Sequence, residues 1–432
     1  MKRVKIIGAG LAGCEAAWYL AQNNIEVDLF EMRPSKTTPA HHTGNLAELV
    51  CSNSFRSDAL TNAAGLLKVE MRQLNSIIMK VADWTRVPAG TALAVDRASF
   101  SLKITEMIKN HPNIRFHVKE ICNIPHPPAI IATGPLTSDG LSEQLASFLG
   151  KEHLYFYDAA APIITGESID WSKVFWGSRY DKGPADYVNI PLTHEEYDIF
   201  YNELINAETQ QLREFEKPKF FEGCIPIEVM AKRGYKTLLF GPLKPVGIVN
   251  PHTGKQPFAV VQLRKENTEG SLFNIVGFQT SLRWKEQKRV FSLLPGLINA
   301  EFIRYGFIHR NTFIRSPIFL NPTLEFKKQK GLFFAGQITG VEGYIESAAT
   351  GIIAGINMKR FINRQEYINV PRETIIGALC NYISSSNPEH FQPMKANFGI
   401  LPPLLAGTLS KKERNRLLSE RALRELKSIV DI

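Results

Sequence analysis

Cysteine side chains are the strongest nucleophiles in this sequence, and two of its five cysteines stand apart from the rest. Most cysteines are small buried apolar residues, and the surroundings of Cys14, Cys122 and Cys380 fit that role. Cys51 instead precedes a run of small polar residues, and Cys224 follows a glycine and precedes a proline-containing segment. Cys51 and Cys224 are therefore the candidate reactive thiols.

The reactivity of a thiol depends on its electrostatic surroundings, because a nearby basic group lowers the pKa of the thiol. Arg56 and Lys232 are basic residues close in sequence to the two candidate cysteines. From the pattern alone, either cysteine is a reactive nucleophile only if the fold brings such a group beside it.

The spacing of cysteines and histidines argues against a metal site. The five cysteines are far apart and no CxxC pair occurs, so neither a zinc knuckle nor a disulfide framework is expected. His41 and His42 are adjacent, and adjacent side chains rarely face the same way, so we expect no metal there. Unpaired cysteines are typical of a reducing compartment, which favours a cytoplasmic protein.

A glycine-rich turn near the N-terminus indicates a second function, the binding of phosphate groups. It has the pattern G-x-G-x-x-G and consists of Gly8, Ala9, Gly10, Leu11, Ala12 and Gly13. Gly8 permits a tight turn, Gly10 lets the backbone approach a pyrophosphate, and Gly13 lets a helix pack closely on a strand. Glu31 follows 18 residues after Gly13, where a carboxylate can accept hydrogen bonds from ribose hydroxyls. This arrangement predicts a bound dinucleotide.

The turn requires a strand before it, and a helix and a second strand after it. Residues 4–7 and 25–30 have the apolar character of buried strands, and residues 14–23 have that of a helix. The apolar spacing predicts one further helix over residues 60–80, and Asp96 is expected to start another that runs to about residue 109.

Two later segments also have the pattern of a buried strand that ends at a glycine. One ends at Thr133 and Gly134, and the other ends at Gly336, before a helix over about 345–362. A strand that feeds a helix N-terminus suits a flavin, because the helix dipole stabilises negative charge on the reduced ring. We therefore expect an α/β fold whose Rossmann-like domain binds FAD.

The pattern of elements changes near residue 155. Alternating strands and helices give way to mixed elements with many aromatic residues. We expect a discontinuous FAD-binding domain, residues 1–154 and 326–432, and a mixed α/β insertion domain, residues 155–325, that faces the substrate.

Composition indicates a soluble globular protein with an anionic partner. The chain has 51 Lys and Arg against 42 Asp and Glu, a net charge of +9, which suggests a polyanion such as a nucleic acid. No apolar run is long enough to span a bilayer, so no membrane partner is expected. The N-terminus leads directly into a strand, so we expect no secretory signal peptide.

Segments along the whole chain resemble the folate- and FAD-dependent tRNA uracil-5-methyltransferases, the TrmFO family, which is related to the wobble-uridine modification flavoprotein GidA. They occur in the family's order and include IIGAGLAGCEAAWYL, FEMRP, AHHTGNLAELVCSNSFRSD, DRASFS, FEGCIPIEVMAKRG, RYGFIHRNTFI and FFAGQITGVEGYIESAATGIIAGIN. The resemblance implies a GidA-type FAD-binding domain. It also implies methylation of uridine C5 in RNA, at T-loop U54 of tRNA. The carbon donor would be 5,10-methylenetetrahydrofolate, with NAD(P)H as the reductant of the flavin.

The resemblance also assigns roles to residues. Uracil C5 is a poor nucleophile until a thiolate adds to C6, and Cys224 matches the family's C6 nucleophile. Cys51 would lie at the flavin and handle the methylene group or the C5 proton, although the family leaves room to exchange the two roles. Tyr344 would stack on the flavin or the folate, or serve only in packing.

RNA recognition requires cationic side chains for the phosphates and an unstacked target base. The candidates for phosphate contacts are Arg283, Lys285, Lys288 and Arg289. No obligate protein partner is expected. The alternatives are the same chemistry on a 23S ribosomal RNA uridine, GidA-like wobble modification, a flavin oxidoreductase of small molecules, and a non-catalytic flavin-containing RNA-binding protein.

Overall fold

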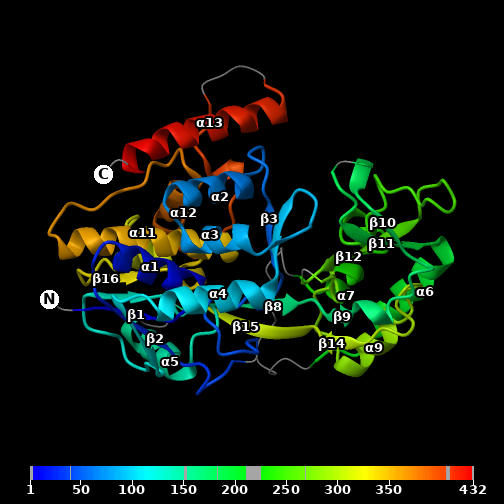
Figure 1. The fold of residues 1–432 in the computed structure, drawn as a ribbon, viewed down its shortest axis with the longest axis horizontal. Helices are drawn as coiled ribbons and strands as arrows, with labels where there is room; N and C mark the ends of the chain where they lie inside the picture. The colour runs from blue at the N-terminus through cyan, green and yellow to red at the C-terminus, as the bar shows by residue number, and fades with distance from the viewer. Residues whose placement is uncertain are drawn as a thin grey trace.

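A five-stranded parallel sheet lies at the centre of the larger of two lobes, here called the first lobe (Figure 1). The strands stand in the order β16, β7, β1, β2, β6, with bounds β1 Val4–Ile7, β2 Val27–Glu31, β6 Ile114–Val118, β7 Ala129–Ile131 and β16 Leu332–Phe334. β7 and β16 are wholly apolar, as expected for a sheet that is covered on both faces. The computed structural model describes residues 3–38, 40–149, 153–181, 183–210, 225–267, 269–404 and 409–430.

Helices cover both faces of this sheet. On one face α1 (Leu11–Gln22) packs along α11 (Tyr344–Ile362), and on the other α5 (Asp139–Leu149) packs near α10 (Ser316–Phe319). The α1–α11 contact is close, since a Cβ on Gly351 of α11 would lie 2.3 Å from an α1 carbonyl oxygen. Small residues in α11 thus let it lie directly against the helix that follows the glycine turn.

The rest of the first lobe is a three-stranded sheet and more helices. The strand bounds, in sheet order, are β3 Ser54–Ser57, β5 Ala92–Val95 and β4 Arg86–Val87. The helix bounds are α2 Ala63–Gln73, α3 Ile77–Trp84, α4 Arg97–Lys109, α12 Ile375–Ser385 and α13 Lys411–Val430.

The expectation of one helix over residues 60–80 is wrong. The chain breaks between α2 and α3, where Asn75 has a φ of +58°. Ser76 then caps α3 by accepting a hydrogen bond from the Met79 amide at 3.0 Å. Both helices bury apolar faces in the same core, so the apolar spacing continues across a break that it does not reveal. The start at Asp96 is confirmed, because its side chain caps α4.

The second lobe, here called the insertion lobe, is built on a six-stranded antiparallel sheet. In sheet order its strands are β10 Phe175–Gly177, β11 Tyr187–Leu192, β12 Ala259–Lys265, β13 Leu272–Ile275, β9 Ile163–Thr165 and β14 Phe302–Arg304. Its helices are α6 His194–Asn206, α7 Ile227–Lys232, α8 Thr237–Phe240 and α9 Trp284–Phe291.

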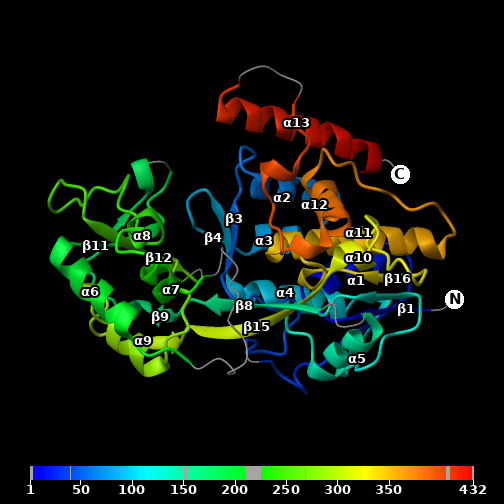
Figure 2. The ribbon, with the colours of Figure 1, turned by 180° about the vertical axis from the view of Figure 1, so that it is seen from behind.

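Two antiparallel strands run between the lobes (Figure 2). They are β8, His153–Ala160, and β15, Phe307–Ile314. The chain therefore enters the insertion lobe along β8 and returns along β15. Among the residues described, no helix has the length and apolar character needed to cross a membrane.

Candidate functional site

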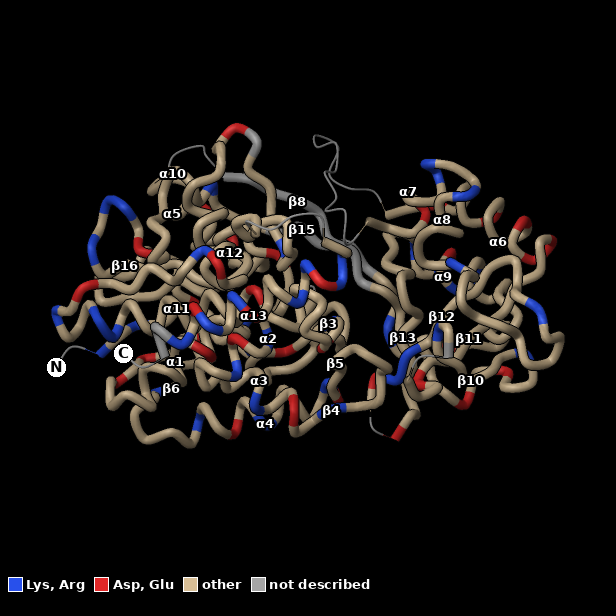
Figure 3. The backbone as a smooth tube through the Cα atoms, turned by 90° about the horizontal axis from the view of Figure 1, so that it is seen from above, with Lys and Arg blue, Asp and Glu red and all other residues tan. Residues whose placement is uncertain are grey.

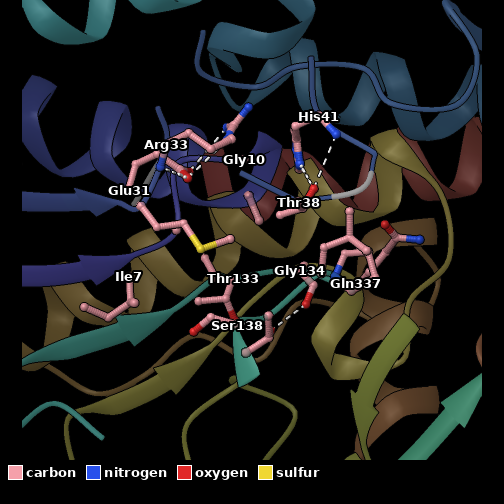
Figure 4. Close-up of a pocket in the computed structure, with 18 of the residues that line it drawn as sticks. Ile7, Gly10, Glu31, Arg33, Thr38, His41, Thr133, Gly134, Ser138 and Gln337 are labelled. Atoms are coloured by element: carbon pink, nitrogen blue, oxygen red, sulfur yellow. Dashed lines mark hydrogen bonds and ion pairs between the residues drawn. The ribbon is translucent and has the colours of Figure 1, made fainter. Parts of the chain in front are cut away.

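A cavity with about 950 Å³ of unfilled space, part of it open solvent, lies at the carboxyl ends of the parallel strands. Ligands of open α/β sheets bind in this position. Figure 4 shows side chains from the glycine turn, the end of β2 and the end of β7 around it. The predicted binding residues that line it are Gly8, Gly10, Leu11, Ala12, Glu31, Thr133, Gly134, Gly336 and Tyr344.

The three glycines of the turn have different surroundings. A Cβ on Gly8, whose φ is +95°, would lie 2.6 Å from the Ala132 carbonyl oxygen, and a Cβ on Gly13 would lie 1.8 Å from that of Gly8. A Cβ on Gly10 would meet nothing within 4 Å. Gly8 and Gly13 are therefore required by the fold itself, whereas Gly10 leaves bare backbone facing free space on the cavity wall.

Glu31 ties the end of β2 to the glycine turn. Its Oε2 accepts a hydrogen bond from the Ala9 amide at 3.0 Å, and its Oε1 accepts from the amide and the Nε of Arg33, both at 3.1 Å. Arg33 also pairs with Glu48 at 3.1 Å. Burial opposes ionisation of Glu31, but the charge and hydrogen bonds of Arg33 hold its pKa below the ordinary value. The hydrogen bond from Glu31 to a ribose stays a prediction.

Replacing Glu31 with glutamine is expected to lower the free energy of unfolding of the flavin-free protein by about 3–5 kcal/mol, because a buried ion pair loses one partner. Urea unfolding measures this loss. The folded-state pKa lies below 4.5, so the contribution is complete at neutral pH and disappears as the pH falls through that pKa. The variant and the wild type should therefore converge in acid.

Glu26→Gln is the matched control for this prediction. Glu26 pairs with Arg3 at 3.2 Å, and its side chain is half exposed. Surface pairs contribute little, so this variant should unfold like the wild type. Equal losses in the two variants would contradict the assigned role of Glu31.

Two turns, one after β7 and one after β16, leave space in the cavity beside the glycine turn. Gly134, with a φ of +68°, has open space at its Cβ position, and Thr137 Oγ1 donates to its carbonyl at 2.9 Å. Thr133 Oγ1 lies 2.6 Å from Thr137 Oγ1. Gly336, with a φ of +83°, approaches the start of α1, since its Cβ would lie 3.0 Å from that of Ala12. Both strand ends therefore leave room beside the glycine turn.

Cys51 lies next to Val50, which lines the same cavity. The Tyr344 hydroxyl accepts hydrogen bonds from the amides of Cys51, at 2.7 Å, and Ser52, at 3.2 Å. Burial, with a further contribution from the charge of Cys51, raises the pKa of Tyr344, so its hydroxyl stays protonated. Tyr344 lines the cavity and begins α11. The start of α11 therefore fixes the backbone of the candidate thiol.

Two arginines hold the carbonyl side of the same loop. Arg304 donates to the Cys51 carbonyl at 2.9 Å and to that of Val50 at 3.2 Å. Arg97 donates to the Cys51 carbonyl at 3.3 Å and pairs with Glu266 at 2.9 Å. Burial and the charge of Arg97 lower the pKa of Arg304 to about 10, so it remains a cation at neutral pH. A negative charge on Cys51 stabilises both guanidinium groups, and they in turn favour the thiolate.

Arg56 is not the basic neighbour that its position in sequence indicated. It forms an ion pair with Glu346 of α11. Arg97 and Arg304 supply the positive charge instead, and sequence reasoning assigned no role to either. Both lie in segments that resemble the family, which is the only signal that marks them. Their contacts with residue 51 span 46 and 253 positions, and no local pattern encodes such contacts.

Replacing Tyr344 with phenylalanine separates anchoring of the loop from ring stacking. The ring remains, but the amides of Cys51 and Ser52 lose their acceptor, which costs about 1–3 kcal/mol when donors stay buried. We expect hydrogen exchange at these two amides to accelerate by roughly tenfold or more, while the protein keeps its flavin. Tyr382→Phe is the control, because the Tyr382 hydroxyl donates to the Gln392 carbonyl at 3.0 Å and, among the described residues, forms no hydrogen bond with the Cys51 loop. Unchanged exchange in Tyr344→Phe would refute the anchoring role.

Cys224 lies outside the described residues, so its distance from Cys51 stays untested. The chain that follows it is fixed. Ile225 is buried, and Glu228 of α7 accepts hydrogen bonds from the hydroxyls of Thr280 and Ser281 at 2.8 and 2.5 Å.

The four candidate RNA-binding residues lie at the start of and along α9, and all four are exposed. Arg283 pairs with Glu208 at 2.7 Å, and Arg289 pairs with Glu203 and Glu286. In the described part of the chain, Lys285 and Lys288 form no ion pair. Figure 3 shows basic and acidic residues interspersed over both lobes.

Metal-binding side chains do not gather in the described residues, where no group of three His, Cys, Asp or Glu side chains could hold an ion. His41 lines the cavity, and its Nδ1 lies 2.7 Å from Thr38 Oγ1.

Known proteins are similar to this chain over most or all of its length. The family model described as "Glucose inhibited division protein A" matches residues 3–366. A protein of Exiguobacterium sibiricum, named Methylenetetrahydrofolate--tRNA-(uracil-5-)-methyltransferase TrmFO, is 58% identical over 434 residues and covers 100% of both chains. A Listeria innocua protein of the same name is 58% identical over 430 residues, covering 100% of this chain and 99% of its own. The chain belongs to the TrmFO family.

The fold of this TrmFO-family chain is also that of GidA. The structure of Aquifex aeolicus GidA aligns with a TM-score of 0.70 at 18% identity, covering 100% of this chain and 74% of that one. Likeness at this identity shows the fold alone, and it confirms the predicted GidA-type α/β fold class. Membership of the TrmFO family confirms the resemblance stated from the motifs and the expectation of an enzyme.

Proposed function

We propose that this TrmFO-family enzyme methylates C5 of uridine 54 in the T-loop of tRNA. It uses 5,10-methylenetetrahydrofolate as the carbon donor, FAD as the bound cofactor and NAD(P)H as the reductant. One observation carries the proposal. The Cys51 loop is anchored, through Tyr344, to the wall of a cavity that the glycine turn forms. Full-length relatives that are 58% identical and named as tRNA uracil-5-methyltransferases support it.

The cavity fits FAD. Its space faces bare backbone at Gly10, where a pyrophosphate needs close approach, and the N-terminus of α1 directs free amide groups toward that position. Residues at the ends of β1, β2, β7 and β16 line it, as an extended dinucleotide requires. When bound, FAD supplies reducing equivalents and an atom that carries the one-carbon unit. The residues of the chain supply the remaining steps.

The two thiols activate the uracil in this proposal. The Cys224 thiolate adds to uracil C6, so that C5 becomes electron-rich and attacks the one-carbon unit. The C5 proton must then leave, and Cys51 is positioned to accept it as a thiolate favoured by Arg97 and Arg304. Loss of that proton would release the one-carbon unit from its carrier as a methylene group on C5. A hydride equivalent supplied by the reductant would then convert this methylene to methyl, while the bond between Cys224 and C6 breaks and the uracil ring is restored. Exchange of the two roles is the alternative assignment.

An assay with defined RNAs tests the proposal. The purified holoenzyme is incubated with methylenetetrahydrofolate, NADH or NADPH, and either unmodified tRNA or fragments of 23S ribosomal RNA. Methyluridine at tRNA position 54 is the expected product, and omission of the folate should abolish it. Methyluridine only in the ribosomal fragments would reassign the substrate. Flavin oxidation without RNA modification would favour a small-molecule oxidoreductase, and RNA binding with no turnover a non-catalytic protein.

A further inference from the structure

Three aromatic rings form a column where α9 meets β14, the edge strand of the insertion lobe (Figure 1). The ring centroids of Phe302 and Tyr305 are 5.2 Å apart with planes at 7°, and those of Tyr305 and Trp284 are 5.6 Å apart with planes at 13°. Phe302 packs against the buried core of the lobe, whereas Trp284 is 62% exposed. The column therefore begins at the core and ends in an aromatic ring open to solvent.

Hydrogen bonds to a buried side chain hold this column rigid. Gln287 of α9 is fully buried. Its Nε2 donates to the Gly306 carbonyl at 2.8 Å, and its Oε1 accepts from the Gly306 amide at 2.7 Å. The helix that carries Trp284 is thereby fixed to the turn that carries Tyr305. A rigid aromatic surface loses little conformational entropy when a ligand stacks on it.

Basic residues surround the exposed end of the column. Lys288 lies one helical turn beyond Trp284, on the same face of α9. Arg283 and Lys285 flank Trp284 in sequence. A single exposed aromatic side chain is ordinary, but a fixed stack bordered by cations is the arrangement that binds unpaired nucleotides, with bases on the rings and phosphates on the cations.

The strand that carries the column also reaches the candidate active site. Arg304 lies between Phe302 and Tyr305 in sequence, and it donates to the Cys51 carbonyl at 2.9 Å. A nucleotide held on the column would therefore lie on the chain segment whose Arg304 contacts the loop that bears the candidate thiol.

We propose that Trp284 stacks against an unpaired base of the RNA substrate and that Lys288 contacts the adjoining phosphate. This inference rests on the proposed function, because it takes RNA as the substrate, and it adds the site that holds a nucleotide beside the target uridine. A protein partner fits less well. The centres of protein interfaces are depleted in lysine, whereas Trp284 has lysines and arginines on its borders.

Binding measurements with full-length holoenzyme test the proposal. Fluorescence anisotropy gives the Kd for an unmodified T-arm stem-loop at several salt concentrations. Trp284→Ala should raise the Kd by roughly 10- to 100-fold and leave the salt slope unchanged, because stacking is not ionic. Trp284→Phe, which retains a stacking ring, should recover much of the affinity. Lys288→Gln should reduce the salt slope by about one, as expected for the loss of one phosphate contact.

Trp84→Ala is the matched control. Trp84 is 57% exposed and has Lys80 over its ring, with Nζ 5.2 Å from the centroid, but it lies on α3 of the first lobe. Its replacement should leave the Kd unchanged. The thermal midpoint and flavin content of every variant report folding, so a folded Trp284→Ala protein with weak binding supports the proposal.

The outcomes separate this inference from the proposed function. If the wild type methylates tRNA and Trp284→Ala binds RNA normally, the stacking site is refuted and the function stands. If the wild type binds RNA through Trp284 but makes no methyluridine, the function fails and the site stands. A change in oligomeric mass with unchanged RNA affinity would overturn the site in favour of a protein interface.

Discussion

Methyluridine formation is expected to stop when Cys224 is replaced by alanine. The rate should fall by at least about 10³-fold, because C5 of uracil remains unreactive without a nucleophile at C6. The flavin should remain bound, because the glycine turn and the strand ends that line the cavity are unchanged in this variant. Mass spectrometry of digested tRNA measures the product, and the absorbance of the purified protein measures the flavin.

A suicide substrate distinguishes the roles of the two thiols. An RNA with 5-fluorouridine at the target position cannot lose a C5 proton, so the nucleophilic cysteine stays bound to C6 and the complex survives denaturation. Cys51→Ala should still form this complex, whereas Cys224→Ala should not. The reverse pattern would exchange the two roles. Cys122→Ala is the control, because Cys122 has no assigned role and is exposed, in contrast to the buried position expected from the sequence. It should behave like the wild type.

Replacing Gly10 with valine is expected to abolish flavin binding without destabilising the flavin-free fold. The φ of Gly10 is −74°, which any residue adopts, and its Cβ direction is free of protein atoms. The added side chain would instead enter the space that the pyrophosphate needs, and we expect affinity for FAD to fall by at least roughly 100-fold. Thermal unfolding with and without FAD measures both properties, because a ligand raises the midpoint only if it binds.

Gly13→Ala provides the contrast. Its Cβ would lie 1.8 Å from the Gly8 carbonyl oxygen, so the turn must move and the flavin-free protein itself should lose stability. Substitutions at these two glycines of one motif are thus expected to have different effects: Gly10→Val should lose flavin binding, and Gly13→Ala should lose stability. Loss of flavin-free stability in Gly10→Val, equal to that in Gly13→Ala, would show that the position of Gly10 is structural and not a contact surface for the ligand.

Local sequence patterns were sufficient to predict much of the secondary structure of the first lobe. The strand, turn and helix at residues 4–22 follow from apolar runs and from glycines whose spacing sets the turn, and all of these signals lie within about twenty positions. The cap at Asp96 is equally local, because its side chain accepts a hydrogen bond from the Ser99 amide, three residues on. The break at Asn75 escaped prediction, since a positive φ leaves no mark on the apolar spacing.

The sequence by itself determined the dinucleotide motif, the family and the candidate thiols, because each is a matter of residue type and short spacing. Only the tertiary structure decided what surrounds Cys51. Its amide meets Tyr344 and its carbonyl meets Arg304, which are 293 and 253 positions away. It also decided that Trp284 ends a column of rings from two elements. Such contacts arise where chain topology brings distant elements together, and the periodicity of one segment carries no information about the partner that it meets.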